Sequence, residues 1–511
     1  MPFVSILFDG TDAGIDIGHE EAPDFFTDLR LDQVVASVVA GREEYRLEPF
    51  FHAPLTDLGS IAYRHEVFQD LESPQLLGAV RSFARGMKAM RDLVARSSKT
   101  RYRYEKERWF LDAADGYCQA VEELADALGG IQLRSRGFQD FRDFLASYLA
   151  SGDFAALRAD TERLKTDLGA VRYRLHIAGN RITVSHYDGE PDYSADVVRT
   201  FEKFRQVQAR GYRLDVPSWP DMNHVEAEIL TRVARLRPEV FGSLDRFCER
   251  HRAYLDETIR RFDREVQFYL AYLEHVERIR SGGLAFCYPV VTDGARDIQG
   301  RDVYDLALAD QLVRNSALMV ANDFQLTPPE RVLIVSGPNQ GGKTTFARTI
   351  GQLHYLASLG CPVPGTEARL FLVDRIFTHF EREEDLRGLT GKLEDELRRV
   401  RWILEQATSA SLLVMNESFG STTLDDALLL STAIMRQVIS RDMLCVSVTF
   451  LDELASLSEA TVSMVSTVDP DDPARRTFKL VRRPADGLAY AAAIAAKHHL
   501  TYAGVKGRIP A

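Results

Sequence analysis

The chain has 511 residues, of which 45% are hydrophobic and 27% are charged, and its 63 Lys and Arg against 75 Asp and Glu give a formal net charge of −12. This composition is typical of a globular protein and excludes a chain that is disordered throughout. The acidic balance argues against a protein that coats nucleic acid through bulk positive charge, although a local basic patch can still contact DNA. At roughly 150 residues per domain, the length suggests about three domains.

The five cysteines are far apart and form no C-x-x-C pair. The sequence therefore supports neither a zinc site nor a disulfide framework, which favours a reducing compartment. The N-terminus, MPFVSILFDG, has neither the basic start nor the long apolar core of a signal peptide. The sequence contains no run of about 18 consecutive apolar residues, so a transmembrane helix is not expected. These features predict a cytoplasmic protein without a membrane partner.

Residues 1–75 mix short apolar runs with Pro and Gly, which predicts short helices joined by turns at the start of a helical core. Residues 76–284 are expected to continue this core as long helices, with breaks at Gly129-Gly130 and Ser151-Gly152. Two apolar stripes at helical spacing support this prediction. The stripes are Leu76, Leu77, Val80, Phe83, Ala84, Met87 and Met90, and then Phe141, Phe144, Leu145 and Tyr148.

A small β insert is expected within the helices. Residues 172–193 alternate between apolar and polar on both sides of Gly179-Asn180, which is a signal for a β-hairpin turn. The later helical patterns and breaks are 194–211, PSWP at 217–220, and 225–279 with interruptions near Pro238 and Gly242.

The last of these helical stretches carries a dense run of charge from residue 250 to residue 265. One interpretation is a solvated helix face with i,i+4 ion pairs, and the other is a face that contacts phosphate. The charged residues are Arg250, Arg252, Asp256, Glu257, Arg260, Arg261, Asp263, Arg264 and Glu265.

From about residue 285 to residue 511 the pattern changes, because short β-rich runs alternate with helical segments. Such alternation predicts an α/β domain with a mostly parallel sheet. The expected strands are 331–336, 411–416, 443–449 and 462–468. The predicted fold is therefore multidomain: an all-α helical core with a small β insert, followed by an α/β domain.

Residues 337–344, GPNQGGKT, fit the pattern G-x-x-x-x-G-K-[ST] between a strand ending at Ser336 and a helix running to Leu359. In a P-loop of this kind, backbone N–H groups and a helix N-terminus converge on phosphates. Lys343 is expected to pair with β- and γ-phosphate oxygens, and Thr344 to ligate Mg²⁺. A chance Gly-rich turn is the alternative. The candidate nucleotide-binding residues are Gly337, Pro338, Asn339, Gln340, Gly341, Gly342, Lys343, Thr344 and Thr345.

A second nucleotide element is expected where a downstream strand ends in acidic residues, and the best candidate is LLVMNE, residues 412–417. Asn416 stands where an Asp normally supports the Mg²⁺ shell. Its amide can accept a hydrogen bond from a metal-bound water but adds no charge. Glu417 is the candidate general base, with a purely structural carboxylate as the alternative. The expected ligands are ATP and Mg²⁺, with Lys343 and Glu417 as catalytic residues and Thr344 and Asn416 at the metal.

GPNQGGKTT closely resembles the P-loop of the MutS family of DNA mismatch-repair ATPases, which typically reads GPNMGGK[ST]T. Further segments resemble this family over about 200 residues. They are VAND (320–323), GCPVPGTEARLFLVDRIFTHFEREEDL (360–386), MNESFGSTT (415–423) and GLAYAAAIAAKHHL (487–500). The resemblance implies an ATPase domain at 285–511, with Met319 packing on the adenine through its thioether and Asn322 nearby. It also implies lever helices with a small clamp at 172–193, and dimerisation through the ATPase domains.

Several departures from the family pattern bear on activity. The helical core is expected to start within about 45 residues, without the family's mismatch-recognition domain, and no C-terminal helix-turn-helix dimerisation element is expected. The signature loop at 386–392 lacks the usual G-R-S-T order, with Thr390 or Lys392 as a substitute. The switch His falls on Phe450, which cannot hydrogen-bond the γ-phosphate. With Asn416, these changes predict slow or partner-dependent hydrolysis, because positioning and charge stabilisation carry phosphoryl transfer.

DNA contact is expected from residues 97–108, which hold five cations and two tyrosines, or from the hairpin tip. The candidates are Lys99, Arg101, Arg103, Lys106 and Arg181. A solvated helix surface is the alternative in each case. The resulting hypothesis is a slow ATPase that couples nucleotide state to duplex or branched DNA in repair or recombination, as a homodimer and without direct mismatch reading. The alternatives are a nucleotide-dependent protein scaffold that has lost DNA binding and, less favoured, a transporter-type ATPase subunit.

Overall fold

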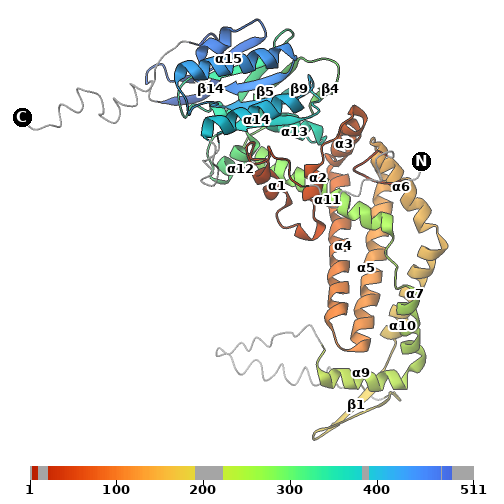
Figure 1. Cartoon of the computed structure of the whole chain (residues 1–511). Helices are drawn as coiled ribbons and strands as arrows, with labels where there is room; N and C mark the ends of the chain where they lie inside the picture. The colour runs from red at the N-terminus through yellow and green to blue at the C-terminus, as the bar shows by residue number, and fades with distance from the viewer. Residues whose placement is uncertain are drawn as a thin grey trace, which may run out of the picture.

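The computed structural model describes residues 3–9, 21–189, 191, 222–381, 391–472 and 475–485. Figure 1 shows an elongated arm of helices with a hairpin at its far end, and a sheet flanked by helices that is built from the C-terminal part of the chain. The predicted combination of a helical part and an α/β part is confirmed. None of the helices in the described ranges is long and apolar enough to cross a membrane.

The described helices of the N-terminal and central parts are α1 (Leu31–Val39), α2 (Glu48–His52), α3 (Leu58–Leu71), α4 (Pro74–Lys99), α5 (Arg103–Gly130), α6 (Arg136–Leu149), α7 (Gly152–Gly169), α9 (His224–Leu236), α10 (Pro238–Arg250) and α11 (Glu257–Arg280). Those that follow are α12 (Leu306–Arg314), α13 (Lys343–Ser358), α14 (Lys392–Gln406) and α15 (Leu424–Ser440), with 3₁₀ turns at Glu43–Tyr45 and Asp452–Ser456.

The described strands are β1 (Tyr173–Ala178), β2 (Arg181–His186), β3 (Phe286–Cys287), β4 (Val290–Thr292), β5 (Ile298–Val303), β6 (Asn322–Leu326), β7 (Val332–Ser336), β8 (Val363–Pro364), β9 (Glu367–Phe371), β10 (Ile376–Phe380), β11 (Leu412–Asn416), β12 (Leu444–Val448), β13 (Thr461–Val468) and β14 (Arg476–Arg482).

The arm is built around α4 and α5, which pack side by side along their length (Figure 1). The 26 residues of α4 extend about 39 Å at 1.5 Å per residue. The first stripe expected from the sequence is the packed face of α4. Its buried members are Leu76, Val80, Phe83, Met87 and Met90, and Leu77 and Ala84 lie at its half-buried edge. The predicted helix breaks are also confirmed, because α5 ends at Gly130 and Ser151 caps α7.

The predicted hairpin is present as β1 and β2, which pair antiparallel around a two-residue turn at Gly179-Asn180. It is attached to the far end of the arm because Val184 packs against a small buried cluster of Val233, Ala234 and Phe241. Figure 1 shows this hairpin beside α9, at the end of the arm most distant from the sheet. The predicted helix at 194–211 and the break at 217–220 lie outside the described residues.

The predicted break near Gly242 is wrong. Gly242 lies inside α10, whereas the break at Pro238 is confirmed because α9 ends just before it. A further break that the apolar pattern did not indicate separates α10 from α11. Asp256 caps α11 there by accepting from the N–H groups of Thr258 (2.8 Å) and Ile259 (3.1 Å). A polar N-cap thus begins a new helix within an otherwise continuous helical pattern.

Neither interpretation of the charged run at 250–265, most of which lies on α11, fits all of its members. Glu257 and Arg260 form an exposed ion pair, as a solvated face predicts. Asp263 is buried against Arg91. Glu265 is also buried and accepts hydrogen bonds from the Ser5 hydroxyl (2.8 Å) and from the N–H of residue 6 (3.0 Å). These buried carboxylates tie α11 to α4 and to the N-terminal segment.

The buried carboxyl of Glu265 predicts a pH-dependent contribution to stability. Burial raises its pKa from 4.5 to about 7. Because the folded carboxyl holds its proton more tightly than the unfolded one, its contribution is present below about pH 4.5 and is lost as the pH rises through about 7. The side chain in Glu265→Gln cannot ionise. Between about pH 4.5 and pH 7, the free energy of unfolding of this variant should therefore rise relative to that of the wild type by up to about 3 kcal/mol. Urea unfolding of both proteins at about pH 5 and pH 8 measures this gain, and an unchanged difference would contradict it.

The α/β part contains a six-stranded sheet with the order β10-β11-β12-β7-β13-β14. All neighbouring pairs are parallel except β13 and β14. The four strands expected from the sequence are β7, β11, β12 and β13, and the mostly parallel sheet is confirmed. A second sheet, with the order β4-β9-β5-β6, lies beside it and was not expected. Its strands are short and are dispersed between Val290 and Phe371 among other elements, which weakens their sequence signal.

The helical and α/β parts share one hydrophobic core. The C-terminal half of α13 is buried in it, and Tyr355 donates to the carbonyl oxygen of Phe51 at 2.7 Å. Arg64 of α3 is fully buried and donates to the carbonyl oxygens of Leu7 (3.1 Å) and Leu359 (2.9 Å). The helix that follows loop 337–342 is therefore anchored in the helical part.

Candidate functional site

Residues 337–342 form the loop between β7 and α13, and its shape depends on glycine. Gly337 has a φ of 111°, and a Cβ there would lie 2.8 Å from the carbonyl oxygen of Ser466. A Cβ at Gly341 would lie 2.2 Å from the Ser466 Oγ. The same hydroxyl donates to the carbonyl oxygen of Gly341 at 2.6 Å. Any larger residue at these two positions would therefore displace the loop from its support on β13.

Lys343 begins α13, and its ammonium group is folded back onto the loop. Nζ donates to the carbonyl oxygens of Gly337 (2.9 Å) and Pro338 (3.4 Å) and to Oδ1 of Asn339 (3.2 Å). Its side chain is only 4% exposed. Burial lowers the pKa of the ammonium group, and the Glu417 carboxylate, 4.0 Å away, opposes this shift.

The ends of three neighbouring strands bring the remaining polar groups to the same place. The Thr344 hydroxyl donates to Oδ1 of Asn416, the last residue of β11, at 2.8 Å. Glu417 follows with a φ of 50°, and its N–H donates to the carbonyl oxygen of Val448 on β12 at 2.9 Å. Because β7, β12 and β11 are parallel neighbours, their carboxyl ends meet at one edge. Lys343, Thr344, Asn416 and Glu417 are therefore brought together.

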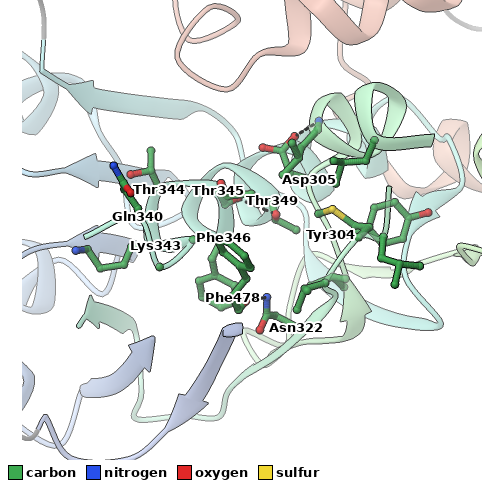
Figure 2. A pocket seen from close by; sticks show the side chains of 18 of the residues that line it. Tyr304, Asp305, Asn322, Gln340, Lys343, Thr344, Thr345, Phe346, Thr349 and Phe478 are labelled. Atoms are coloured by element: carbon green, nitrogen blue, oxygen red, sulfur yellow. Dashed lines mark hydrogen bonds between the residues drawn. The ribbon is translucent and has the colours of Figure 1, made fainter. Parts of the chain in front are cut away.

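A cavity of about 690 Å³ opens beside this edge and extends toward α12 (Figure 2). Polar groups of loop 337–342 and of the first turn of α13 line one end, together with Glu417. Apolar side chains of α12 and of the segment before β6 line the other. Of the predicted nucleotide-binding residues, those that line the cavity are Asn339, Gln340, Gly341, Gly342, Lys343, Thr344, Thr345, Met319 and Asn322, whereas Gly337 and Pro338 do not.

Asn322 has a structural role that the sequence did not indicate. Its amide nitrogen donates to the carbonyl oxygen of Phe478 (3.1 Å), and its Oδ1 accepts from the N–H of Leu480 (2.8 Å). Both polar groups of this side chain are therefore engaged with β14. Asn322 lines the cavity while it holds β6 and β14 together.

Phe478 and Ser466 were missed by sequence reasoning. Phe478 lines the cavity with a φ of 60° and is 48% exposed, and Figure 2 shows its ring next to Phe346 and Asn322. An exposed aromatic ring in a strand with a left-handed backbone is a feature that only the structure reveals. Ser466 lies in an apolar strand pattern that suggested packing and carried no signal for a loop contact.

The structure describes Phe450, which stands at the predicted switch position, but only part of the predicted signature loop. Phe450 lies at the site, since its ring centroid is 4.6 Å from Nζ of Lys343. Most of the proposed signature loop, including Thr390, lies outside the described residues, and so does the segment 487–500. Lys392 begins α14 and pairs with Glu381.

The candidate DNA contacts gather at the far end of the arm. Lys99, Arg101 and Lys106 are exposed and make no ion pair with a described residue. Arg103 instead pairs with Glu107 and with a carboxylate of α10, which agrees with the solvated-surface alternative at that position.

The hairpin has one basic face, which adds cations to the same end of the arm. Alternate residues of β1 and β2 point to the same side of the hairpin. Arg174 and His176 share a face with Arg181 by the pairing register, and Arg174 contacts the hydroxyl of Ser185 at 3.1 Å. All three basic residues are exposed, and the described part of this face carries no acidic residue.

Comparison with known proteins agrees with this architecture. Residues 333–492 match the family model for MutS domain V. The chain is also 25% identical over 245 residues to a DNA mismatch repair protein MutS of Thermotoga petrophila, and 26% identical over 245 residues to that of Thermotoga maritima. The chain is thus similar to the MutS family over most of its α/β part. The MutS matches cover 47% of this chain and 29% of each relative, so the chain spans less than a third of the curated relatives' length.

Proposed function

We propose that this chain is a member of the MutS family that binds ATP at the loop 337–342 and hydrolyses it slowly. The observation that carries the proposal is the meeting of Lys343, Thr344, Asn416 and Glu417 at the carboxyl edge of the parallel sheet, beside a cavity large enough for a nucleotide. A glycine-rich loop that leads into a helix N-terminus binds phosphate through backbone N–H groups and the helix dipole. The apolar end of the cavity supports binding of the base, with Phe478 and Met319 available for packing.

The residues present fit Mg²⁺ that arrives together with a nucleotide. Thr344 and Asn416 supply neutral oxygens 2.8 Å apart, and Mg²⁺ prefers oxygen ligands while retaining waters and phosphates. No group of three or more His, Cys, Asp or Glu that could hold a metal exists among the described residues. Phosphate oxygens and waters would complete the shell. Mg²⁺ would there neutralise charge on the phosphates.

Glu417 is proposed to orient and deprotonate the attacking water, which predicts a separation of binding from turnover. Glu417→Gln keeps the shape of the side chain but removes the base, so hydrolysis should fall by about 10²- to 10⁴-fold while ATP affinity changes little. Steady-state phosphate release and equilibrium ATP binding measure the two quantities. Turnover that survives in Glu417→Gln would remove Glu417 from this role.

We further propose that nucleotide state is coupled to DNA held at the far end of the arm. The supporting observations are the cations at that end and the anchoring of α13 in the helical core through Tyr355 and the turn at Leu359. Two copies would join through their α/β parts. Leu424 and Leu429 of α15 support this, since they are 70% and 69% exposed close to the strand ends. Sedimentation of the full chain with and without ATP tests the association.

The DNA contact predicts a change in salt dependence. The slope of log K against log salt is negative, and each lost phosphate contact reduces its magnitude by about 0.9. The triple variant Lys99→Ala/Arg101→Ala/Lys106→Ala should therefore reduce the magnitude by up to about 3. The control is Arg398→Ala/Arg401→Ala, which removes exposed cations from α14 in the α/β part. Equal slopes in both variants would contradict the assignment. No duplex binding by the wild type at low salt would instead favour the protein-scaffold function.

A further inference from the structure

The ammonium group of Lys343 has no free N–H left for a ligand. An ammonium carries three donors, and the three oxygens of loop 337–342 described above accept from them. The Phe450 ring covers the group as well, with its centroid 4.6 Å from Nζ. A terminal phosphate that approached Lys343 would have to replace part of this shell.

The ring is held in place by its neighbours rather than by core packing. Phe450 is 54% exposed, so burial of the ring does not explain its position. The N–H of Thr449 donates to the carbonyl oxygen of Val335 (3.0 Å), and the N–H of Leu451 donates to the Thr449 hydroxyl (3.0 Å). Leu451 is itself buried. The backbone is therefore pinned on both sides of Phe450, and its side chain projects over Lys343.

We propose that the Phe450 ring competes with the terminal phosphate of a nucleoside triphosphate for Lys343, and so shifts the site toward nucleoside diphosphates. A diphosphate can replace loop oxygens on one side of the ammonium group while the ring stays on another. A triphosphate needs the ring to leave, because its additional phosphate also pairs with this lysine. This inference rests on the proposed nucleotide site and adds the residue that sets its preference.

The test compares the affinities of Mg²⁺-ADP and a non-hydrolysable Mg²⁺-ATP analogue in the wild type and three variants. Phe450→Ala and Phe450→Leu both remove the aromatic face, so each should raise the triphosphate-to-diphosphate affinity ratio about two- to fivefold, the factor expected for an exposed cation–π contact. Phe450→Tyr keeps the face and should retain the wild-type ratio.

Each outcome decides the inference. An unchanged ratio in Phe450→Ala, with ADP still bound, overturns the inference and leaves the proposed nucleotide site standing. A wild-type ratio in Phe450→Leu also overturns it, because apolar bulk alone would then suffice. Wild-type protein that binds neither nucleotide would overturn the proposed function and this inference together.

Discussion

Replacing Lys343 by alanine is expected to weaken ATP binding by about 10- to 150-fold, the loss that follows from removing one hydrogen bond to a charged group. The ammonium group is the only side-chain cation among the described residues that line the cavity. Isothermal titration with Mg²⁺-ATP measures the effect.

The matched control is Lys88→Ala, which removes an exposed cation on α4, away from the cavity. It should leave ATP affinity unchanged. If Lys343→Ala bound ATP as tightly as the control does, loop 337–342 would not be the phosphate site, and the proposed function would fail with it.

Replacing Arg64 by alanine should lower the free energy of unfolding by about 3–5 kcal/mol. The guanidinium group is completely buried, and its carbon Cζ lies 5.2 Å from the ring centroids of both Phe8 and Phe268. Truncation leaves a cavity and removes the donors for the carbonyl oxygens of Leu7 and Leu359. Urea unfolding measures the loss.

Arg64→Met separates the two causes. Methionine fills much of the volume, and it also removes the buried guanidinium nitrogen that has no partner within the described residues. Its cost should therefore be smaller than that of alanine, because both variants lose the guanidinium group but alanine leaves the larger cavity. If methionine were as destabilising as alanine, the two orphaned carbonyl groups alone would account for the loss.

Much of the fold was predictable, because local patterns reflect local geometry. The 3.6-residue stripe of α4, the two-residue turn at Gly179-Asn180 and the apolar runs of β7 and β11 each depend on residues close in sequence. The break before α11 and the burial of Glu265 were not predictable in this way. The break depends on an N-cap within a helical pattern. The burial of Glu265 depends on Ser5, which lies 260 residues away from it in the chain.

The sequence by itself determined the chemistry of the site: a glycine-rich loop that ends in Lys343 and Thr344, and a strand that ends in Asn416 and Glu417. Glycines that allow a close approach of the backbone and a lysine at the start of the following helix are local features, so the sequence alone records them. Only the tertiary structure decided which residues complete the site. Ser466 supports the loop and Phe450 covers the lysine because parallel strands far apart in the chain end at one edge of the sheet. No local pattern records that meeting, since strand order is set by packing across the whole sheet.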